Sequence, residues 1–178
     1  MAIQLHTLTN MEVKRASFAA SLSSVADEKK RLRIETVLGR LNEINTLQTT
    51  LFMNILKRLQ TGLNEVQTKA DAYGKETGKD LSKVYQAIDL ANTALADAVT
   101  AVTVQAEQVY TLTVTTAGSV RESYGKERSK LASDLKKVRD TVQNARKKVG
   151  EALKAYRAAS GKTDKIIVPT ASSSAAQS

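Results

Sequence analysis

A row of apolar or small residues between positions 81 and 112 constrains this chain more than any other feature. Its members recur at alternating steps of three and four, about 3.5 residues on average, which is typical of a coiled-coil seam. The row consists of Leu81, Val84, Ile88, Ala91, Leu95, Ala98, Val102, Gln105, Val109 and Leu112. Only three charged residues, Asp89, Asp97 and Glu107, fall within residues 84–116. The row therefore predicts a central helix that other helices contact on more than one side.

The segment from Asp27 to Tyr73 predicts a long first helix. Apolar positions recur there at a mean step of about 3.6, which is one face of a straight helix. They are Ile34, Val37, Leu41, Ile44, Gln48, Leu51, Ile55, Leu59, Leu63, Val66 and Ala70. A second row widens this face in its middle and consists of Leu38, Leu47, Phe52 and Leu56. At about 1.5 Å per residue, this helix would be roughly 70 Å long.

Glycines indicate two corners that separate three helices. Gly74 is a candidate C′ glycine, and Thr77 with Asp80 has the spacing of a capping box, as Ser119 has with Glu122. The third helix carries its own heptad row, Leu131, Leu135, Val138, Val142, Ala145, Val149, Ala152 and Tyr156. Short connections favour antiparallel neighbours. We therefore predict an all-α protein, an elongated antiparallel three-helix coiled-coil bundle over residues 27–159, with helices at about 27–73, 80–117 and 120–159.

The two terminal segments are predicted separately. In residues 1–26, Thr9 and Glu12 at capping-box spacing favour a short helix, whereas Lys14 and Arg15 before residues 16–26 outline a weak signal peptide. Because that stretch is rich in Ser, we favour a cytoplasmic location and keep export as the alternative. Residues 160–178 are rich in Ser and Ala and predict a disordered tail. The chain has no run of 18 apolar residues, so we expect no transmembrane segment.

Two alternatives to this organisation stay open. Residues 109–115 partly alternate apolar and polar side chains, as a strand would. We favour a helix there because no turn residue interrupts residues 79–117 and a lone strand would have no partner. The sequence at residues 73–76, Tyr-Gly-Lys-Glu, recurs at residues 124–127, so a duplicated helix start is an alternative to chance similarity.

Positive charge is concentrated in the third predicted helix. Residues 120–159 hold 12 Lys and Arg against 5 Asp and Glu, and this segment supplies most of the net charge of +9. Eight of these side chains are candidate anion-binding residues: Lys136, Lys137, Arg139, Arg146, Lys147, Lys148, Lys154 and Arg157. They would contact the phosphates of nucleic acid, anionic lipid or an envelope polymer. The alternative is a solvated helix face, because no aromatic or amide cluster lies among them to recognise bases.

The residues that most enzymes use are missing from recognisable patterns. There is no Cys, no Trp and one His, and His6 has neither a Cys nor another His nearby, so we predict no metal site and no cofactor. No glycine-rich phosphate loop and no Ser–His pair occurs. Aromatic residues make up only 4% of the chain, which long helices tolerate better than compact enzymes do. We therefore expect a protein that is not an enzyme.

The helical stretch from about Arg31 to Arg157 resembles a known class of proteins. The alternation in residues 40–44, 87–96 and 138–153 is similar to that of uncharacterised long-helix proteins from reduced-genome candidate-phyla bacteria. The composition is also similar to that of granule-coating phasins. The resemblance implies long helices and no activity, and the export signal usual in the former group has no clear counterpart here.

Surplus apolar surface suggests how such a protein would act. Three helices need one buried row each, whereas Leu38, Leu47, Phe52 and Leu56 form an additional row. Exposed apolar rows usually mark interfaces. We therefore expect a structural or scaffolding protein that self-associates through this row or through the face of residues 84–116. The alternative function is sequence-independent binding of a polyanion, and a protein partner cannot be named from the sequence.

Overall fold

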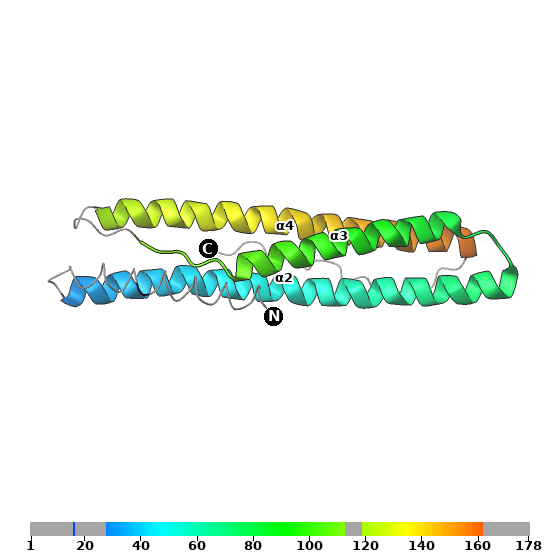
Figure 1. The fold of residues 1–178 in the computed structure, drawn as a ribbon, viewed down its shortest axis with the longest axis horizontal. Helices are drawn as coiled ribbons and strands as arrows, with labels where there is room; N and C mark the ends of the chain where they lie inside the picture. The colour runs from blue at the N-terminus through cyan, green and yellow to red at the C-terminus, as the bar shows by residue number, and fades with distance from the viewer. Residues whose placement is uncertain (1–15, 17–27, 113–118, 162–178) are drawn as a thin grey trace. The chain divides into compact units, whose positions relative to one another are not determined.

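The computed structural model describes residue 16, residues 28–112 and residues 119–161. Helix α2 spans Glu28–Thr77, α3 spans Ser82–Ala106 and α4 spans Ser119–Ser160 (Figure 1). No strand occurs within these described ranges, so the prediction of an all-helical protein with three helices is confirmed. The predicted short helix at Thr9, the signal-like stretch, His6 and most of the predicted tail lie outside the described residues.

The chain divides into two compact units, which we describe separately. The first unit contains α2 up to Leu51 together with residues 101–139, which include the end of α3 and α4 up to Arg139. The second unit takes α2 from Phe52, α3 up to Thr100, and α4 from Asp140. In each unit, parts of all three helices contribute to the buried side chains.

The predicted rows of the second and third helices are the buried faces of α3 and α4. On α3, every predicted position from Leu81 to Gln105 is buried, and on α4 every predicted position from Leu131 to Tyr156 is buried. Each fully buried Leu, Val or Ile contributes about 1.5–3 kcal/mol relative to an exposed side chain. Burial of these rows therefore stabilises both helices. Residues 99–104, which are rich in β-branched side chains, are helical.

On α2, the buried face departs from the predicted one between residues 44 and 55. The prediction took Ile44, Leu51 and Ile55 as core positions, but these three side chains are exposed. The buried residues follow steps of three and four instead: Ile34, Leu38, Leu41, Asn45, Thr49, Phe52, Leu56, Leu59, Leu63, Val66, Ala70 and Tyr73. Two of these buried positions are occupied by polar residues, Asn45 and Thr49, so the spacing of apolar residues alone does not reveal them. This is a correction of the predicted face.

The corner between α2 and α3 lies four residues later than predicted. Helix α2 continues through Gly74 to Thr77, and Gly78 is the residue with positive φ, at 65°. The Gly78 N–H donates to the Gly74 carbonyl at 2.9 Å, which is a left-handed glycine cap. Asp80 then caps α3, because its carboxylate accepts a hydrogen bond from the Ser82 N–H at 2.9 Å. At the far end, Gly161, also at φ 65°, ends α4 in the same way.

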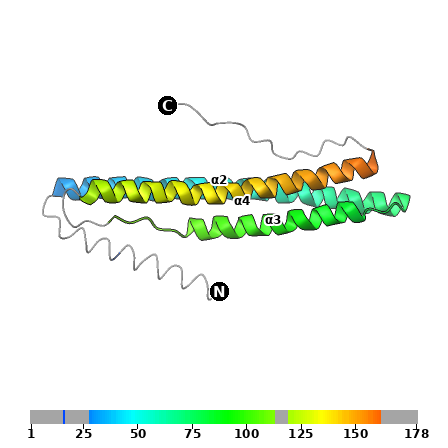
Figure 2. The same ribbon diagram turned by 90° about the horizontal axis from the view of Figure 1, so that it is seen from above.

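Helix α3 ends at Ala106, well before the predicted end at residue 117. Residues 107–112 continue as non-helical chain (Figures 1 and 2), while residues 113–118 lie outside the described residues. Tyr110 and Leu112 are nevertheless buried, and Leu112 lies in one apolar cluster with Ile34 and Leu38. The non-helical segment therefore continues the core of the first unit. The alternative of a strand is not seen in residues 107–112.

A network of hydrogen bonds within the first unit surrounds the end of α3. We call it the amide network, and it consists of Asn42, Asn45, Gln105 and Tyr110. The Asn45 side-chain amide donates to the Gln105 carbonyl at 2.9 Å and to the Gln108 carbonyl at 3.3 Å. The Gln105 amide donates to Asn45 Oδ1 at 2.8 Å and to the Tyr110 hydroxyl at 2.7 Å. Buried polar groups are costly unless paired, and these groups are paired.

Asn42 pairs with the backbone of Tyr110 in both directions. Its Nδ2 donates to the Tyr110 carbonyl at 3.1 Å, and its Oδ1 accepts from the Tyr110 N–H at 3.0 Å. The Tyr110 hydroxyl donates to Asp134 Oδ2 on α4 at 3.2 Å. Burial raises the pKa of Tyr110 to about 12, and the Asp134 carboxylate acts in the same direction, against the hydrogen bond from Gln105. The phenol therefore stays protonated and able to donate at neutral pH.

Candidate interaction surface

An exposed apolar row on α2 is the surface feature of the first unit that most calls for a partner. Ile44, Leu47 and Leu51 are 46%, 57% and 55% exposed. Their steps of three and four place them on one face of the helix. The polar residues Asn45 and Thr49 occupy the buried face, so these apolar side chains point away from it. We call Ile44, Leu47 and Leu51 the exposed row.

The residues predicted for self-association do not form a common surface. Leu38, Phe52 and Leu56 are 8%, 7% and 1% exposed and belong to the chain's own core. Leu47 alone among the four is exposed, and it belongs to the exposed row. The predicted row mixed two faces because its members were chosen for being apolar rather than for their angular position. The exposed apolar residues that could form a contact on this part of α2 are therefore Ile44, Leu47 and Leu51.

The spacing of the buried residues was the signal that could have found the exposed row. From Leu41, steps of three and four lead through Asn45 and Thr49 to Phe52 and Leu56. Polar residues at two successive seam positions are unusual, since a buried amide or hydroxyl needs a partner. Thr49 meets this need within its own helix, because its hydroxyl donates to the Asn45 carbonyl at 2.9 Å.

The eight basic candidates on α4 all lie at least partly at the surface. Lys136, Lys137 and Arg139 belong to the first unit and are exposed. In the second unit, Lys147 and Lys154 are exposed, while Arg146, Lys148 and Arg157 are half-buried. They do not lie on one face, since adjacent residues on a helix are separated by about 100°. The structure therefore leaves both predicted roles open for them, a binding face or a solvated surface.

Several of these charges already have carboxylate neighbours. Lys148 donates to Glu151 at 2.8 Å, and Lys147 lies 4.0 Å from the same carboxylate. The hydrogen bond from Lys148 lowers the pKa of Glu151, helped by the nearby lysine charges. In the first unit, Lys137 lies 3.6 Å from Asp134. Such exposed pairs contribute little to stability.

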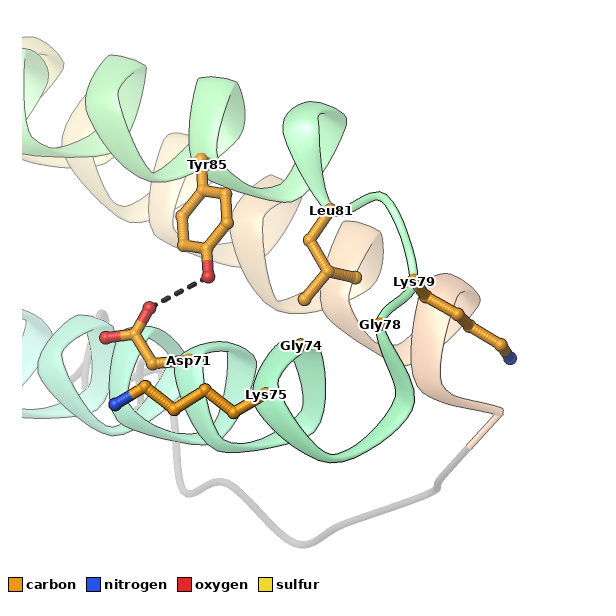
Figure 3. Close-up of a pocket in the computed structure, with 7 residues that line it drawn as sticks. All are labelled: Asp71, Gly74, Lys75, Gly78, Lys79, Leu81 and Tyr85. Atoms are coloured by element: carbon orange, nitrogen blue, oxygen red, sulfur yellow. Dashed lines mark hydrogen bonds between the residues drawn. The ribbon is translucent and has the colours of Figure 1, made fainter.

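A surface pocket of about 410 Å³ lies at the corner between α2 and α3 in the second unit (Figure 3). Its lining consists of Asp71, Gly74, Lys75, Gly78, Lys79, Leu81 and Tyr85. The Tyr85 hydroxyl donates to Asp71 at 2.9 Å, and Lys79 Nζ donates to the Tyr73 hydroxyl at 2.8 Å. These polar groups therefore hold the corner together, and Figure 3 shows Lys79 directed away from the other labelled side chains.

Gly74 lies close to the side chain of Leu81 at this corner. A Cβ atom at residue 74 would lie 3.2 Å from Leu81 Cδ1, closer than an ordinary van der Waals contact. A larger residue here would therefore require the Leu81 side chain to shift by a few tenths of an ångström. Gly125, at the matching position of the recurring Tyr-Gly-Lys-Glu sequence, has open space where a side chain would be. The two positions thus differ in their surroundings.

Two other kinds of site concern the described residues, a metal site and a membrane-spanning helix. In that part of the chain, no group of three or more His, Cys, Asp or Glu side chains is placed to hold a metal ion. By length and composition, α3 could cross a membrane, and a third of its most apolar window is buried inside the structure. The core helix of a bundle passes the same test, so the expectation of no transmembrane segment stays a prediction.

Family models, curated protein sequences and solved structures were compared with the chain, and none of them matches.

Proposed function

We propose that the protein is a structural, non-enzymatic helical protein that acts through helix–helix association, with the exposed row as its contact. The observation that carries this proposal is the exposure of Ile44, Leu47 and Leu51 on one face of α2. Their side chains are large and apolar, and monomers seldom leave such a row uncovered. Asn45 and Thr49 lie in the core on a different face of α2 from these three side chains.

The same proposal includes an elongated, antiparallel three-helix coiled coil. Two observations support it, the steps of three and four between buried residues and the hydrogen bonds between helices. In the second unit, Asp71 pairs with Tyr85 and Gln60 with Asn92, so positions later in α3 meet earlier positions in α2. In the first unit, Asn45 pairs with Gln105 and Asn42 with Tyr110, in the same sense. Small-angle scattering that indicates a compact globule would contradict the elongated form.

Sedimentation of the full chain over a hundredfold range of concentration tests the association. We expect the mean mass to rise with concentration and to fall to the monomer mass in the double variant Leu47→Ser/Leu51→Ser. The matched control is Leu90→Ser, because Leu90 is 51% exposed but lies on α3, apart from the exposed row. If the wild type stays strictly monomeric at the highest concentration, association is excluded. If the double variant still associates, another surface forms the contact.

Sequence-independent binding of a polyanion through α4 is the second candidate function. The observation in its favour is that all eight basic candidates lie at least partly at the surface. Such binding depends on phosphate or sulfate contacts that release counterions, so it weakens steeply as salt rises. It would not need base recognition, which agrees with the lack of an aromatic cluster among the eight residues.

Retention on heparin or duplex DNA tests this second function. We expect the variant Lys147→Gln/Lys154→Gln to elute at lower salt than the wild type and to show a smaller dependence of affinity on salt. The control is Lys57→Gln/Arg58→Gln on α2, which removes the same charge from exposed residues of the same unit. Equal losses in both variants would indicate an effect of net charge alone and would exclude a binding site on α4.

A further inference from the structure

Nothing in the local sequence requires α3 to end at Ala106. Residues 107–112 are Glu-Gln-Val-Tyr-Thr-Leu, without the Gly or Pro that commonly ends a helix. The seam spacing also continues, since Val102, Gln105, Val109 and Leu112 follow steps of three, four and three. A helix that continued through Leu112 would keep an apolar face along this row. The end of α3 must therefore be determined by contacts with the rest of the fold.

The amide network supplies those contacts. When a helix ends, its last carbonyl groups lose their partners within the helix and need others. Asn45 on α2 donates to the carbonyl of Gln105, close to the end of α3, and to that of Gln108, two residues past its end. Asn42 pairs with both backbone groups of Tyr110, at 3.0 and 3.1 Å. The Glu107 N–H still donates to the Thr103 carbonyl, and the Gln108 N–H donates to the Gln105 carbonyl. Side chains of α2 supply further partners for the backbone of residues 105–110.

The network also decides which side chain of the segment enters the core. Tyr110 is 1% exposed, and its hydroxyl lies between Gln105 and Asp134, whereas Val109 is only half-buried. In a continued helix, Val109 would take the seam position and Tyr110 would lie about 100° away from it. Lys130 on α4 adds a contact to the non-helical form, with Nζ 5.9 Å from the centre of the Tyr110 ring.

We propose that the amide network is a latch that selects between two forms of the end of α3. In the latched form, α3 ends at Ala106 and Tyr110 is buried. In the other form, α3 continues as a helix through Leu112, Val109 replaces Tyr110 in the seam, and the Tyr110 hydroxyl leaves Asp134. Through the latch, the length of α3 depends on a contact with α4, because Asp134 of α4 is one of the groups that hold Tyr110 in place.

The test replaces the three amides of the network by an apolar side chain of similar size, in the variant Asn42→Leu/Asn45→Leu/Gln105→Leu. Backbone ¹³C chemical shifts report helix residue by residue, and ¹³Cζ shifts of the five tyrosines report each phenol's titration. We expect residues 107–112 to change from non-helical to helical shifts. We also expect the Tyr110 titration to move down from about pH 12 toward the ordinary value of about 10.

The matched control is Asn54→Leu/Asn64→Leu/Asn92→Leu, which adds the same number of leucines at exposed amides of the second unit. It should leave the shifts of residues 107–112 unchanged. If the network variant does not fold, the single variant Asn42→Leu provides the second test, because it removes both hydrogen bonds to the Tyr110 backbone and keeps the phenol. In that variant too, we expect the segment to become helical. Non-helical shifts for residues 107–112 in either folded variant would overturn the proposal.

Discussion

Two leucines on α2 offer a sharp test of the corrected core face. The sequence placed Leu47 and Leu56 in the same row, whereas the structure makes Leu47 57% exposed and Leu56 1% exposed. The perturbation is the same in both cases, Leu→Ala in the interior of one long helix. Differences in helix propensity therefore cancel between the two variants, and only burial separates them.

The magnitudes follow from that difference in burial. Leu56→Ala removes buried methyl groups and leaves a cavity, so we expect a loss of about 2–5 kcal/mol in the free energy of unfolding. Leu47→Ala changes a side chain that is more than half in water, and surface substitutions of this kind usually stay within about 0.5 kcal/mol. The predicted gap between the variants is therefore at least about 1.5 kcal/mol.

Urea unfolding followed by circular dichroism measures both values, with the slope against denaturant checked for constancy. The measurement should be made at low protein concentration. At high concentration, association through the exposed row would stabilise the wild type but not the Leu47→Ala variant. At higher concentration, the cost of Leu47→Ala should rise if the row forms an interface, while that of Leu56→Ala should show no such extra rise. Equal costs for the two variants at low concentration would refute the assignment of the buried face of α2.

Three further predictions concern the amide network and the glycines. Asn45→Ala should cost about 1–3 kcal/mol, because it removes the hydrogen bonds of the buried Asn45 side chain with the Gln105 carbonyl, the Gln108 carbonyl and the Gln105 side-chain amide. Asn54→Ala at an exposed site should cost little, and urea unfolding compares the two variants. Because burial raises the pKa of Tyr110 to about 12 in the folded chain, above about 10 in the unfolded chain, the unfolded state loses this proton first. The stability that this phenol contributes should be present below pH 10 and be lost as the pH rises from about 10 to 12, a loss that Tyr110→Phe should not show in the same unfolding assay. Thermal melting should place Gly78→Ala below the wild type by about 1–2 kcal/mol, since φ is 65° there, while Gly39→Ala, in open space within α2, should stabilise by up to about 1 kcal/mol.

The sequence by itself determined the helical class and the buried faces of two helices. On α3 and α4, apolar residues occupy the seam positions, so periodicity and burial coincide from Leu81 to Val102 and from Leu131 to Tyr156. A helix with one continuous apolar row must bury that row, whatever it packs against. The row of α3 could therefore be read from spacing alone, although it includes Gln105.

Only the tertiary structure decided where the polar residues go. Asn45 and Gln105 lie about 60 positions apart in the chain yet share a buried hydrogen bond, and no local pattern pairs them. With Asn45 on the buried face of α2, Ile44, Leu47 and Leu51 are exposed, and α3 ends at Ala106 with Tyr110 buried. A buried amide is stable only with a partner of the right geometry, and that partner comes from another segment of the chain. The residues of the candidate contact and the end of α3 therefore both lie beside a hydrogen bond between distant residues, which spacing along the chain does not reveal.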